Sequence, residues 1–416
     1  MASTAALIIF VLTFAGVALT RLPWVRLDRP AAAFLGAVAM VLFGVMTPFQ
    51  AVGAINWDTI SLLLGMMVII AGLQHDGYVQ TLAMAVLGKA RSAPQLLVAV
   101  IGFTGLASAF LVNDAVVLVL TPILVTCCRA RGVNPVPFLL AEAMASNIGG
   151  AATITGNPQN MLIGLQTGIS YGGFLLRLLP VAVAGSLVLG GCTWWVYRRE
   201  LRQRFAPVID GPDRTQPWLR FRPSGVILVL VVLGFMASRW TGVEVPLVAL
   251  AGAALVLALS GRSPGELFIR VDWVLLLFFA GLFVVIGGAV GTGLLDQVID
   301  AAPVTGDFLG VVMLHGLSLG LSQLISNVPY TVLITPVLQA QHSDLLWLSL
   351  ASAATLAGNL TLIGAVSNLI VAEGAAQEGV RITFGEFFNL GLPVTALSMG
   401  VSLLVLWVES ALGLLV

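Results

Sequence analysis

Long apolar runs, separated by short groups of charged residues, extend over most of the chain and predict membrane-spanning helices. Most of these runs are close to the length, about 20 residues, that crosses the hydrocarbon core as a helix. Regular spans are expected at 2–20, 31–47, 57–74, 174–197, 224–240 and 245–260. Arg21, Arg26 and Arg29 follow the first run, so the positive-inside rule places that loop in the cytoplasm and the N-terminus outside.

The apolar segment 95–128 is too long for one span and is interrupted at its centre by Asn113 and Asp114. As one straight helix its 34 residues would be about 51 Å long, against a hydrocarbon core of about 30 Å. Basic residues flank both ends. These features favour a re-entrant hairpin that enters from the cytoplasm, turns at Asn113 and leaves on the same side; two short tilted spans are the alternative. Residues 308–338 predict a second hairpin that enters from outside.

Two further segments, 136–167 and 344–372, predict helices that cross the membrane but are broken in the middle. The first contains the sequences Ser146-Asn147-Ile148-Gly149-Gly150 and Gly156-Asn157-Pro158-Gln159-Asn160. Glycine and proline at this depth leave backbone groups that hydrocarbon cannot satisfy. The unwound part is therefore expected to be buried in protein or to line a cavity.

The second half of the chain repeats the residue pattern of the first. Four spaced patterns recur in the same order at offsets of 216, 214, 208 and 213 residues: Trp57…Gly65 as Trp273…Gly281, Asn113…Pro122 as Asn327…Pro336, Gly150…Asn160 as Gly358…Asn368, and Phe174…Pro180 as Phe387…Pro393. Five predicted crossings lie between Trp57 and Trp273, the first residues of the two repeats' patterns. Because five is an odd number, the two repeats have opposite orientations in the membrane. Inverted repeats with paired broken helices are typical of secondary transporters that bind substrate near the bilayer midplane.

The predicted fold is therefore an all-α polytopic membrane protein with two inverted-topology repeats. Each repeat has a re-entrant hairpin and a discontinuous transmembrane helix, and we expect about 10 crossings plus 2 hairpins. The expected parts are two N-terminal helices (1–55), the first repeat (56–197), an arginine-rich cytoplasmic linker (198–223), two connecting helices (224–270) and the second repeat (271–416).

Composition and motifs narrow the function classes. Apolar residues make up 59% of the chain and charged residues only 9%, far below the roughly 25% of soluble domains, so a soluble fold is excluded. The net charge of zero gives no reason to expect nucleic-acid binding. Three cysteines and three histidines show no zinc spacing, and nucleotide, metalloprotease and haem motifs are absent from the sequence. We expect no enzyme and no cofactor, which leaves transport, channel activity or a structural membrane role.

Four polar, small-residue points are expected to meet near the midplane, where each presents the ends of half-helices. Exposed N–H groups suit an anion or a polar neutral solute, and exposed carbonyls suit a cation. The candidate substrate-binding residues are Asn113, Asn147, Thr153, Asn157, Asn160, Ser326, Asn327, Asn359, Thr361 and Asn368. The alternative is that five of these polar residues only cap the following half-helix, namely Asn113, Asp114, Ser326, Asn327 and Asn359.

Two carboxylates are candidates for proton coupling, because an ionisable side chain at membrane depth is costly and by default functional. Asp114 lies at the predicted tip of the first hairpin, and its repeat counterpart is Val328, which cannot titrate. The alternative for Asp114 is a permanently charged helix cap. Glu142, five residues before Asn147, is the second candidate, although it could instead face the cytoplasmic mouth.

At these residues the chain resembles the ion transporter superfamily, in the branch of arsenical-pump membrane permeases and bacterial sodium–proton antiporters. The phrases that carry the resemblance are Val112-Asn113-Asp114-Ala115, Ser146 to Gly150, Gly156 to Asn160, Ser326-Asn327-Val328-Pro329 and Gly358 to Gly364. The resemblance implies substrate bound between two hairpin tips and two broken helices. The carboxylate-transporting branch carries Ser-Asn-Thr at its tips, which this chain lacks, so a proton-driven cycle is favoured over sodium-coupled dicarboxylate uptake.

The expected function is secondary active transport of a small inorganic solute or oxyanion, coupled to protons, with arsenite or antimonite efflux as the most specific hypothesis. A sodium–proton antiporter, or an anion channel or permease for another substrate, is the alternative. The expected partners are the solute, a proton or sodium ion, the lipid bilayer and, for an arsenical pump, a soluble ATPase subunit. The expected location is the cell inner (cytoplasmic) membrane, as a multi-pass protein.

Overall fold

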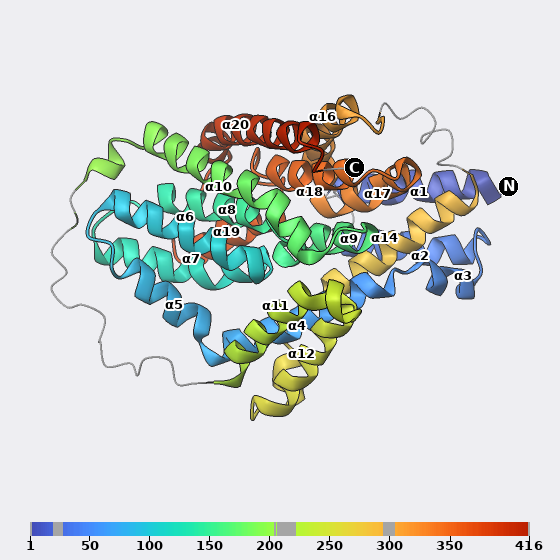
Figure 1. The fold of residues 1–416 in the computed structure, drawn as a ribbon, viewed down its shortest axis with the longest axis horizontal. Helices are drawn as coiled ribbons and strands as arrows, with labels where there is room; N and C mark the ends of the chain where they lie inside the picture. Colours follow the sequence, from blue (N-terminus) through green and yellow to red (C-terminus); the bar gives the residue numbers. More distant parts are fainter. Residues whose placement is uncertain (1, 20–27, 204, 206–221, 294–303, 415–416) are drawn as a thin grey trace.

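The computed structural model describes residues 2–19, 28–203, 205, 222–293 and 304–414, and in these ranges the regular structure is entirely helical (Figure 1). Most of the predicted linker 198–223 lies outside the described residues. The α-helices of the first half are α1 (Ala2–Ala18), α2 (Arg29–Leu42), α3 (Pro48–Ala54), α4 (Trp57–Asp76), α5 (Tyr78–Leu87), α6 (Ala93–Phe110), α7 (Asn113–Ala130), α8 (Val136–Gly150), α9 (Pro158–Gln166) and α10 (Tyr171–Val196), with short 3-10 turns η1 (Ile154–Gly156) and η2 (Glu200–Arg202).

The second half continues with α11 (Pro223–Thr241), α12 (Val245–Leu259), α13 (Pro264–Phe268), α14 (Trp273–Gly291), α16 (Phe308–Ile325), α17 (Asn327–Gln341), α18 (Asp344–Ala357), α19 (Val366–Gln377) and α20 (Phe384–Ala411). Within the described ranges, eight helices are long and apolar enough to cross a membrane unaided. Counted with the shorter helices, the described ranges contain ten segments that match the expected crossings (α1, α2, α4, α8–α9, α10, α11, α12, α14, α18–α19 and α20) plus the hairpins α6–α7 and α16–α17. The predicted fold class is confirmed.

Each hairpin has its two ends close together, so that it begins and ends on the same side of the molecule. At the open end of the first, the guanidinium of Arg131 just after α7 donates to the carbonyl of Leu87, which precedes α6, at 3.0 Å. At the open end of the second, a Cβ on Gly306 before α16 would lie 3.9 Å from the side-chain oxygen of Gln341, the last residue of α17. Each hairpin therefore enters and leaves at the same end, as the sequence predicts.

The second helix of each half, α2 or α12, packs on a helix of the other half. A Cβ on Gly65 of α4 would lie 2.7 Å from the backbone of Ala249 in α12, and a Cβ on Gly281 of α14 would lie 2.9 Å from the backbone of Ala33 in α2. Both members of these pairs are related by the same offset of 216 residues. The close contacts therefore obey the repeat symmetry, with α12 of the second half on α4 of the first, and α2 of the first half on α14 of the second.

A tryptophan contact extends the symmetry to the short helices that precede α4 and α14. The indole N–H of Trp57 donates to the carbonyl of Val52 at 3.3 Å, and that of Trp273 donates to the carbonyl of Phe268 at 2.9 Å. The apolar pattern of the sequence did not reveal α3, α5 or α13, because each is too short to give a span-like run. The α4–α5 boundary is set by Gly77, whose φ of 72° ends α4 in a left-handed conformation that glycine adopts without strain.

Candidate substrate site between the hairpin tips

The break in the first discontinuous helix is a tight backbone crossing that only small residues allow. After α8 ends at Gly150, the chain turns through η1 and begins α9 at Pro158. A Cβ on Gly156 would lie 2.1 Å from the carbonyl oxygen of Gly150, so a larger residue does not fit. The side chain of Asn160 donates to the carbonyls of Gly150 and Thr153 at 3.2 and 3.1 Å and so satisfies groups that the break exposes.

The second discontinuous helix repeats this arrangement between α18 and α19. A Cβ on Gly364 would lie 2.8 Å from the carbonyl oxygen of Gly358. The side chain of Asn368 donates to the carbonyls of Gly358 and Thr361 at 2.7 and 3.1 Å. Every partner is displaced by 208 residues from its counterpart in the first repeat. Asn160 and Asn368 therefore hold the broken backbone in the same way, each through its side-chain amide nitrogen.

The hairpin tips meet these breaks. The side-chain amide of Asn113, the first residue of α7, donates to the side-chain oxygen of Asn147 in α8 at 3.2 Å. A Cβ on Gly358 would lie 2.8 Å from the side-chain nitrogen of Asn327, the first residue of α17. Ser326, which joins α16 to α17, has φ 71° and ψ 165°, a conformation that is almost restricted to glycine. The second tip is therefore held in a strained turn.

Asn147 connects the two repeats. Its side-chain nitrogen donates to the side-chain oxygens of Asn359 at 2.9 Å and Asn368 at 3.1 Å, both in the second repeat. Its side-chain oxygen accepts from Asn113 at 3.2 Å and from the hydroxyl of Ser367 at 2.9 Å. All five side chains are buried. One carboxamide thus joins the first hairpin tip and both broken helices.

The symmetry-related position makes the reciprocal contact. Thr355 is the counterpart of Asn147, and Ser367 is the counterpart of Gln159, both at the 208-residue offset. The hydroxyl of Thr355 accepts from the side chains of Asn157 at 3.2 Å and Gln159 at 3.3 Å. The contacts between repeats therefore occur in pairs, Asn147 with Ser367 and Thr355 with Gln159. Such pairs are expected when two repeats are related by a pseudo-twofold axis.

The two predicted threonines face the first arms of the hairpins. The hydroxyl of Thr153 donates to the carbonyl of Ala109 at the end of α6. The hydroxyl of Thr361 donates to the side-chain oxygen of Gln323 in α16 at 2.7 Å, and Gln323 in turn donates to the carbonyl of Ala357 at 2.8 Å. Ala109 and Gln323 are themselves counterparts at the 214-residue offset of the hairpins.

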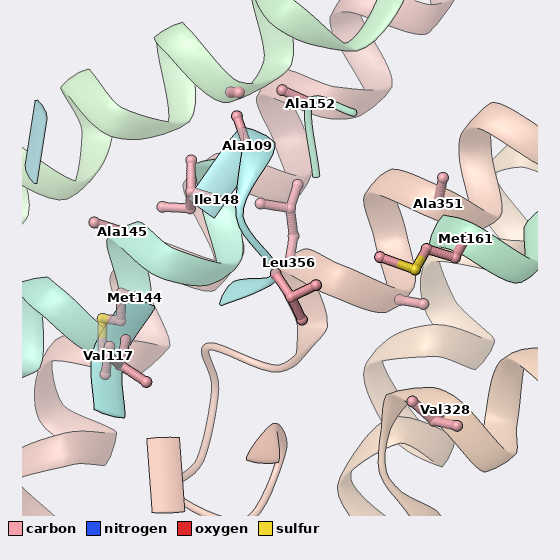
Figure 2. Close-up of a cluster of buried hydrophobic side chains, with 14 of the residues drawn as sticks. Ala109, Val117, Met144, Ala145, Ile148, Ala152, Met161, Val328, Ala351 and Leu356 are labelled. Carbon is pink, nitrogen blue, oxygen red and sulfur yellow. The ribbon is translucent and has the colours of Figure 1, made fainter. Parts of the chain in front are cut away.

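Several polar atoms in this region have no hydrogen-bond partner in the described part of the chain. They are the side-chain oxygens of Asn113, Asn327 and Asn160 and the side-chain nitrogen of Asn359. Figure 2 shows part of the buried apolar cluster that the same region contributes, including Ile148 of α8, Met161 of α9, Val328 of α17 and Leu356 of α18. A buried amide atom without a partner costs free energy, so these atoms are suited to bind a polar solute.

One candidate asparagine caps a helix, and it is not one of the residues for which capping was the alternative. The side chain of Asn157 accepts from the backbone N–H of Asn160 at 2.8 Å and caps α9. The residues before α7, α17 and α19 make no such side-chain cap. Asn113 and Asn359 use their side chains to contact Asn147 instead.

The two candidate proton-coupling residues lie in different surroundings. Asp114 is half-buried in the first turn of α7. Glu142 is fully buried in α8, where one carboxyl oxygen accepts from the hydroxyl of Thr121 at 3.0 Å and the other has no partner among the described residues. In the described part of the chain, no three His, Cys, Asp or Glu side chains gather to hold a metal ion.

Sequence reasoning did not select Gln159, Gln323, Thr355 or Ser367, which take part in the network. Applying the 208-residue offset to Asn147 would have pointed to Thr355, and applying it to Gln159 would have pointed to Ser367. Gln323 has no polar counterpart, since Ala109 occupies that position and supplies a backbone carbonyl in its place.

Comparisons with known proteins identify relatives of this chain and a solved structure with the same fold. Uncharacterized transporter Rv2685 of Mycobacterium tuberculosis is 34% identical over 98% of this chain and 99% of its own length. Silicon efflux transporter LSI3 of Oryza sativa subsp. japonica is 28% identical over 90% of this chain and 91% of its own. The crystal structure of the YdaH transporter of Alcanivorax borkumensis, which has an unusual topology, shares the fold with a TM-score of 0.57 and 16% identity, over 99% of this chain and 98% of that one.

A family model described as citrate transporter (CitMHS) matches residues 7–355, which include the first repeat, the helices that follow it, the second hairpin and nearly all of α18. The chain therefore belongs to the citrate transporter (CitMHS) family of the ion transporter superfamily and is a membrane transporter.

Proposed function

We propose that this protein is a proton-coupled secondary transporter that exports a small, uncharged, hydroxylated solute, with arsenite or antimonite as the most specific candidate. The observation that carries the proposal is the network around Asn147, which joins a hairpin tip of one repeat to the broken helix of the other. Amides and hydroxyls offer donors and acceptors without net charge. A solute with several hydroxyl groups can use both kinds.

The charge of the region argues against a strongly anionic substrate, although the family description names citrate. Among the described lysines and arginines only Arg131 is buried, and it lies at the end of α7, away from the hairpin tip. Half-helix N-termini each supply only about half a positive charge. A multiply charged carboxylate would require more positive potential than these ends provide.

The relative named for silicon efflux supports a hydroxylated solute. In neutral water both silicon and trivalent arsenic are present mainly as uncharged hydroxides. A binding region of carboxamides and hydroxyls is therefore compatible with either element, and export is the direction that the relative's name indicates.

Proton coupling is supported by the two carboxylates of the first repeat. Asp114 and Glu142 have the counterparts Val328 and Leu350, so the second repeat carries no titratable group at either position. Asp114 is next to the tip residue Asn113, in the first turn of the second arm of the hairpin. A sodium–proton antiporter would be expected to place more carboxylates around the tips than these.

Complementation of an arsenite-sensitive bacterium that lacks its own pump tests the proposal. The wild-type protein should restore growth on arsenite or antimonite, and Asn113→Ala or Asn327→Ala should abolish the resistance at equal expression. Asn389→Ala, which changes an exposed asparagine of α20, is the matched control and should keep it. If the wild type gives no resistance and vesicles show sodium-dependent proton movement, the sodium–proton antiporter replaces the proposal.

A further inference from the structure

A cavity of about 970 Å³ opens at the end of the molecule that is predicted to face outward. It lies where the C-terminal end of α9, the start of α4, the α11–α12 connection, the start of α18 and the end of α20 come together. The hydrogen bond from the side chain of Gln339 to that of Gln166, at 2.7 Å, joins the open end of the second hairpin to the end of α9 on this side. We call this space the outer cavity.

The outer cavity is lined by more acidic than basic side chains. The carboxylates are Asp58 of α4, Glu244 before α12, Asp344 of α18 and Glu409 of α20, and the cations are Arg177 of α10 and Arg239 of α11. Four carboxylates and two guanidinium groups give a formal charge of −2 when all are ionised. A cavity with this charge raises the local concentration of cations, including protons.

Glu409 differs from the other three carboxylates because it is buried. Its side chain is 8% exposed, and one carboxyl oxygen has no hydrogen-bond partner among the described residues. Arg177, a cation of the same cavity, donates instead to the backbone carbonyl of Leu414 at 2.6 Å and forms no ion pair with Glu409 within 4.0 Å. A buried carboxyl oxygen with no donor is suited to bind a proton.

The repeat symmetry shows that packing alone does not require these charges. The counterparts of Arg177 and Glu409 in the other repeat are Leu390 and Val196, and the counterpart of Asp344 is Val136. The same helices therefore pack in the inverted repeat with apolar side chains at these positions. Charged side chains at these three positions therefore occur only in the repeat halves that line the outer cavity, and not at the equivalent positions of the inverted repeat.

We propose that Glu409 is the residue that takes up the coupling proton from the outer solution, an inference that rests on the proposed proton-coupled function. A proton from hydronium in the outer cavity binds the carboxyl group of Glu409 and leaves water behind. When Glu409 loses this proton again, the proton passes to water on the cytoplasmic side of the residue. Arg177, Arg239, Asp58, Glu244 and Asp344 are the charged groups of the surrounding elements that set the field at this carboxyl.

Glu409→Gln tests the inference, with Glu244→Gln as the matched control, because Glu244 is an exposed carboxylate of the same cavity that makes no capping hydrogen bond. Each protein is reconstituted in liposomes, and infrared difference spectra are recorded as the outer solution is acidified, always at least about one unit above the ordinary glutamate pKa of about 4.3, so that exposed carboxylates stay ionised. The wild type and Glu244→Gln should gain the same protonated-carboxyl band, and Glu409→Gln should lose it. Size-exclusion elution of each variant reports folding.

The second readout is arsenite flux driven by an imposed pH gradient, measured against outer pH. Glu409→Gln should lose the pH dependence that the wild type and Glu244→Gln share. An unchanged band or an unchanged pH profile in Glu409→Gln overturns the inference. If the wild type shows no flux driven by the pH gradient, the proposed function fails, and the infrared band alone still decides whether Glu409 takes up a proton.

Discussion

Replacing Asn147 by alanine should weaken the contact between the two repeats more than any other single change in the polar network. The carboxamide of Asn147 makes four side-chain hydrogen bonds, three of them to the second repeat. Its counterpart Thr355 accepts two hydrogen bonds from the first repeat. Asn147 and Thr355 occupy equivalent positions in the two repeats, so the effects of replacing them can be compared directly. Asn147 makes four of these hydrogen bonds and Thr355 makes two.

The magnitude follows from the number of hydrogen bonds. Inter-helix hydrogen bonds in membrane proteins contribute about 0.6 kcal/mol each on average, because the unfolded chain in the membrane also finds partners. Asn147→Ala should then lower the free energy of unfolding by about 2.4 kcal/mol, and Thr355→Val by about 1.2 kcal/mol. Thr355→Val keeps the shape of the side chain and removes only the hydroxyl.

Reversible unfolding of the detergent-solubilised protein, followed by the fluorescence of its nine tryptophans, measures both free energies. Asn389→Ala, on the exposed face of α20, should change the free energy of unfolding little. The double variant Asn147→Ala/Ser367→Ala should be less destabilised than the sum of the single variants, because the two residues share a hydrogen bond. Equal losses for Asn147→Ala and Thr355→Val, or strict additivity of the double variant, would refute the reasoning.

Three further predictions concern the backbone, the packing and the topology. Ser326→Gly should stabilise the protein by about 1 kcal/mol, because φ 71° is strained for serine, whereas Ser326→Ala should not; thermal unfolding in detergent distinguishes them. Gly65→Ala should destabilise by about 1–3 kcal/mol in the same assay, because its Cβ would meet the backbone of α12 at 2.7 Å. Single cysteines at Glu378 and Glu244, in a cysteine-free background, should label from opposite sides of the membrane; labelling from one side contradicts the inverted topology.

The fold could be predicted from the sequence to the level of spans, hairpins and repeats. Apolar runs and arginine positions gave the spans, and the recurring patterns around Asn113, Gly150, Asn327 and Gly358 gave the inverted repeats. Which helices pack together could not be predicted in this way. Equivalent positions in two repeats show that contacts recur, but they do not show that α12 packs on α4 and α2 on α14, since that depends on the path of the chain in three dimensions.

Part of the polar network was selected from the sequence. The structure brings Asn113, Asn147, Asn359 and Asn368 into one network, but it also gives Asn160 and Asn368 a bracing role that residue type alone does not indicate. An asparagine beside a broken helix can bind either substrate or an exposed carbonyl, and both uses require the same side chain. Substrate binding by these residues and proton coupling by Asp114 and Glu142 stay predictions.

The most direct test of proton-coupled export is arsenite movement in proteoliposomes under an imposed pH gradient, without sodium. The proposed mechanism predicts that the wild-type protein concentrates arsenite against its gradient when a pH gradient is present and stops when a protonophore is added. Asp114→Asn, which keeps the size of the side chain and removes its titratable group, should abolish the accumulation and still elute as a folded protein. Arsenite movement that only follows its own concentration gradient, at the same rate with and without the pH gradient, would contradict the mechanism and indicate a channel.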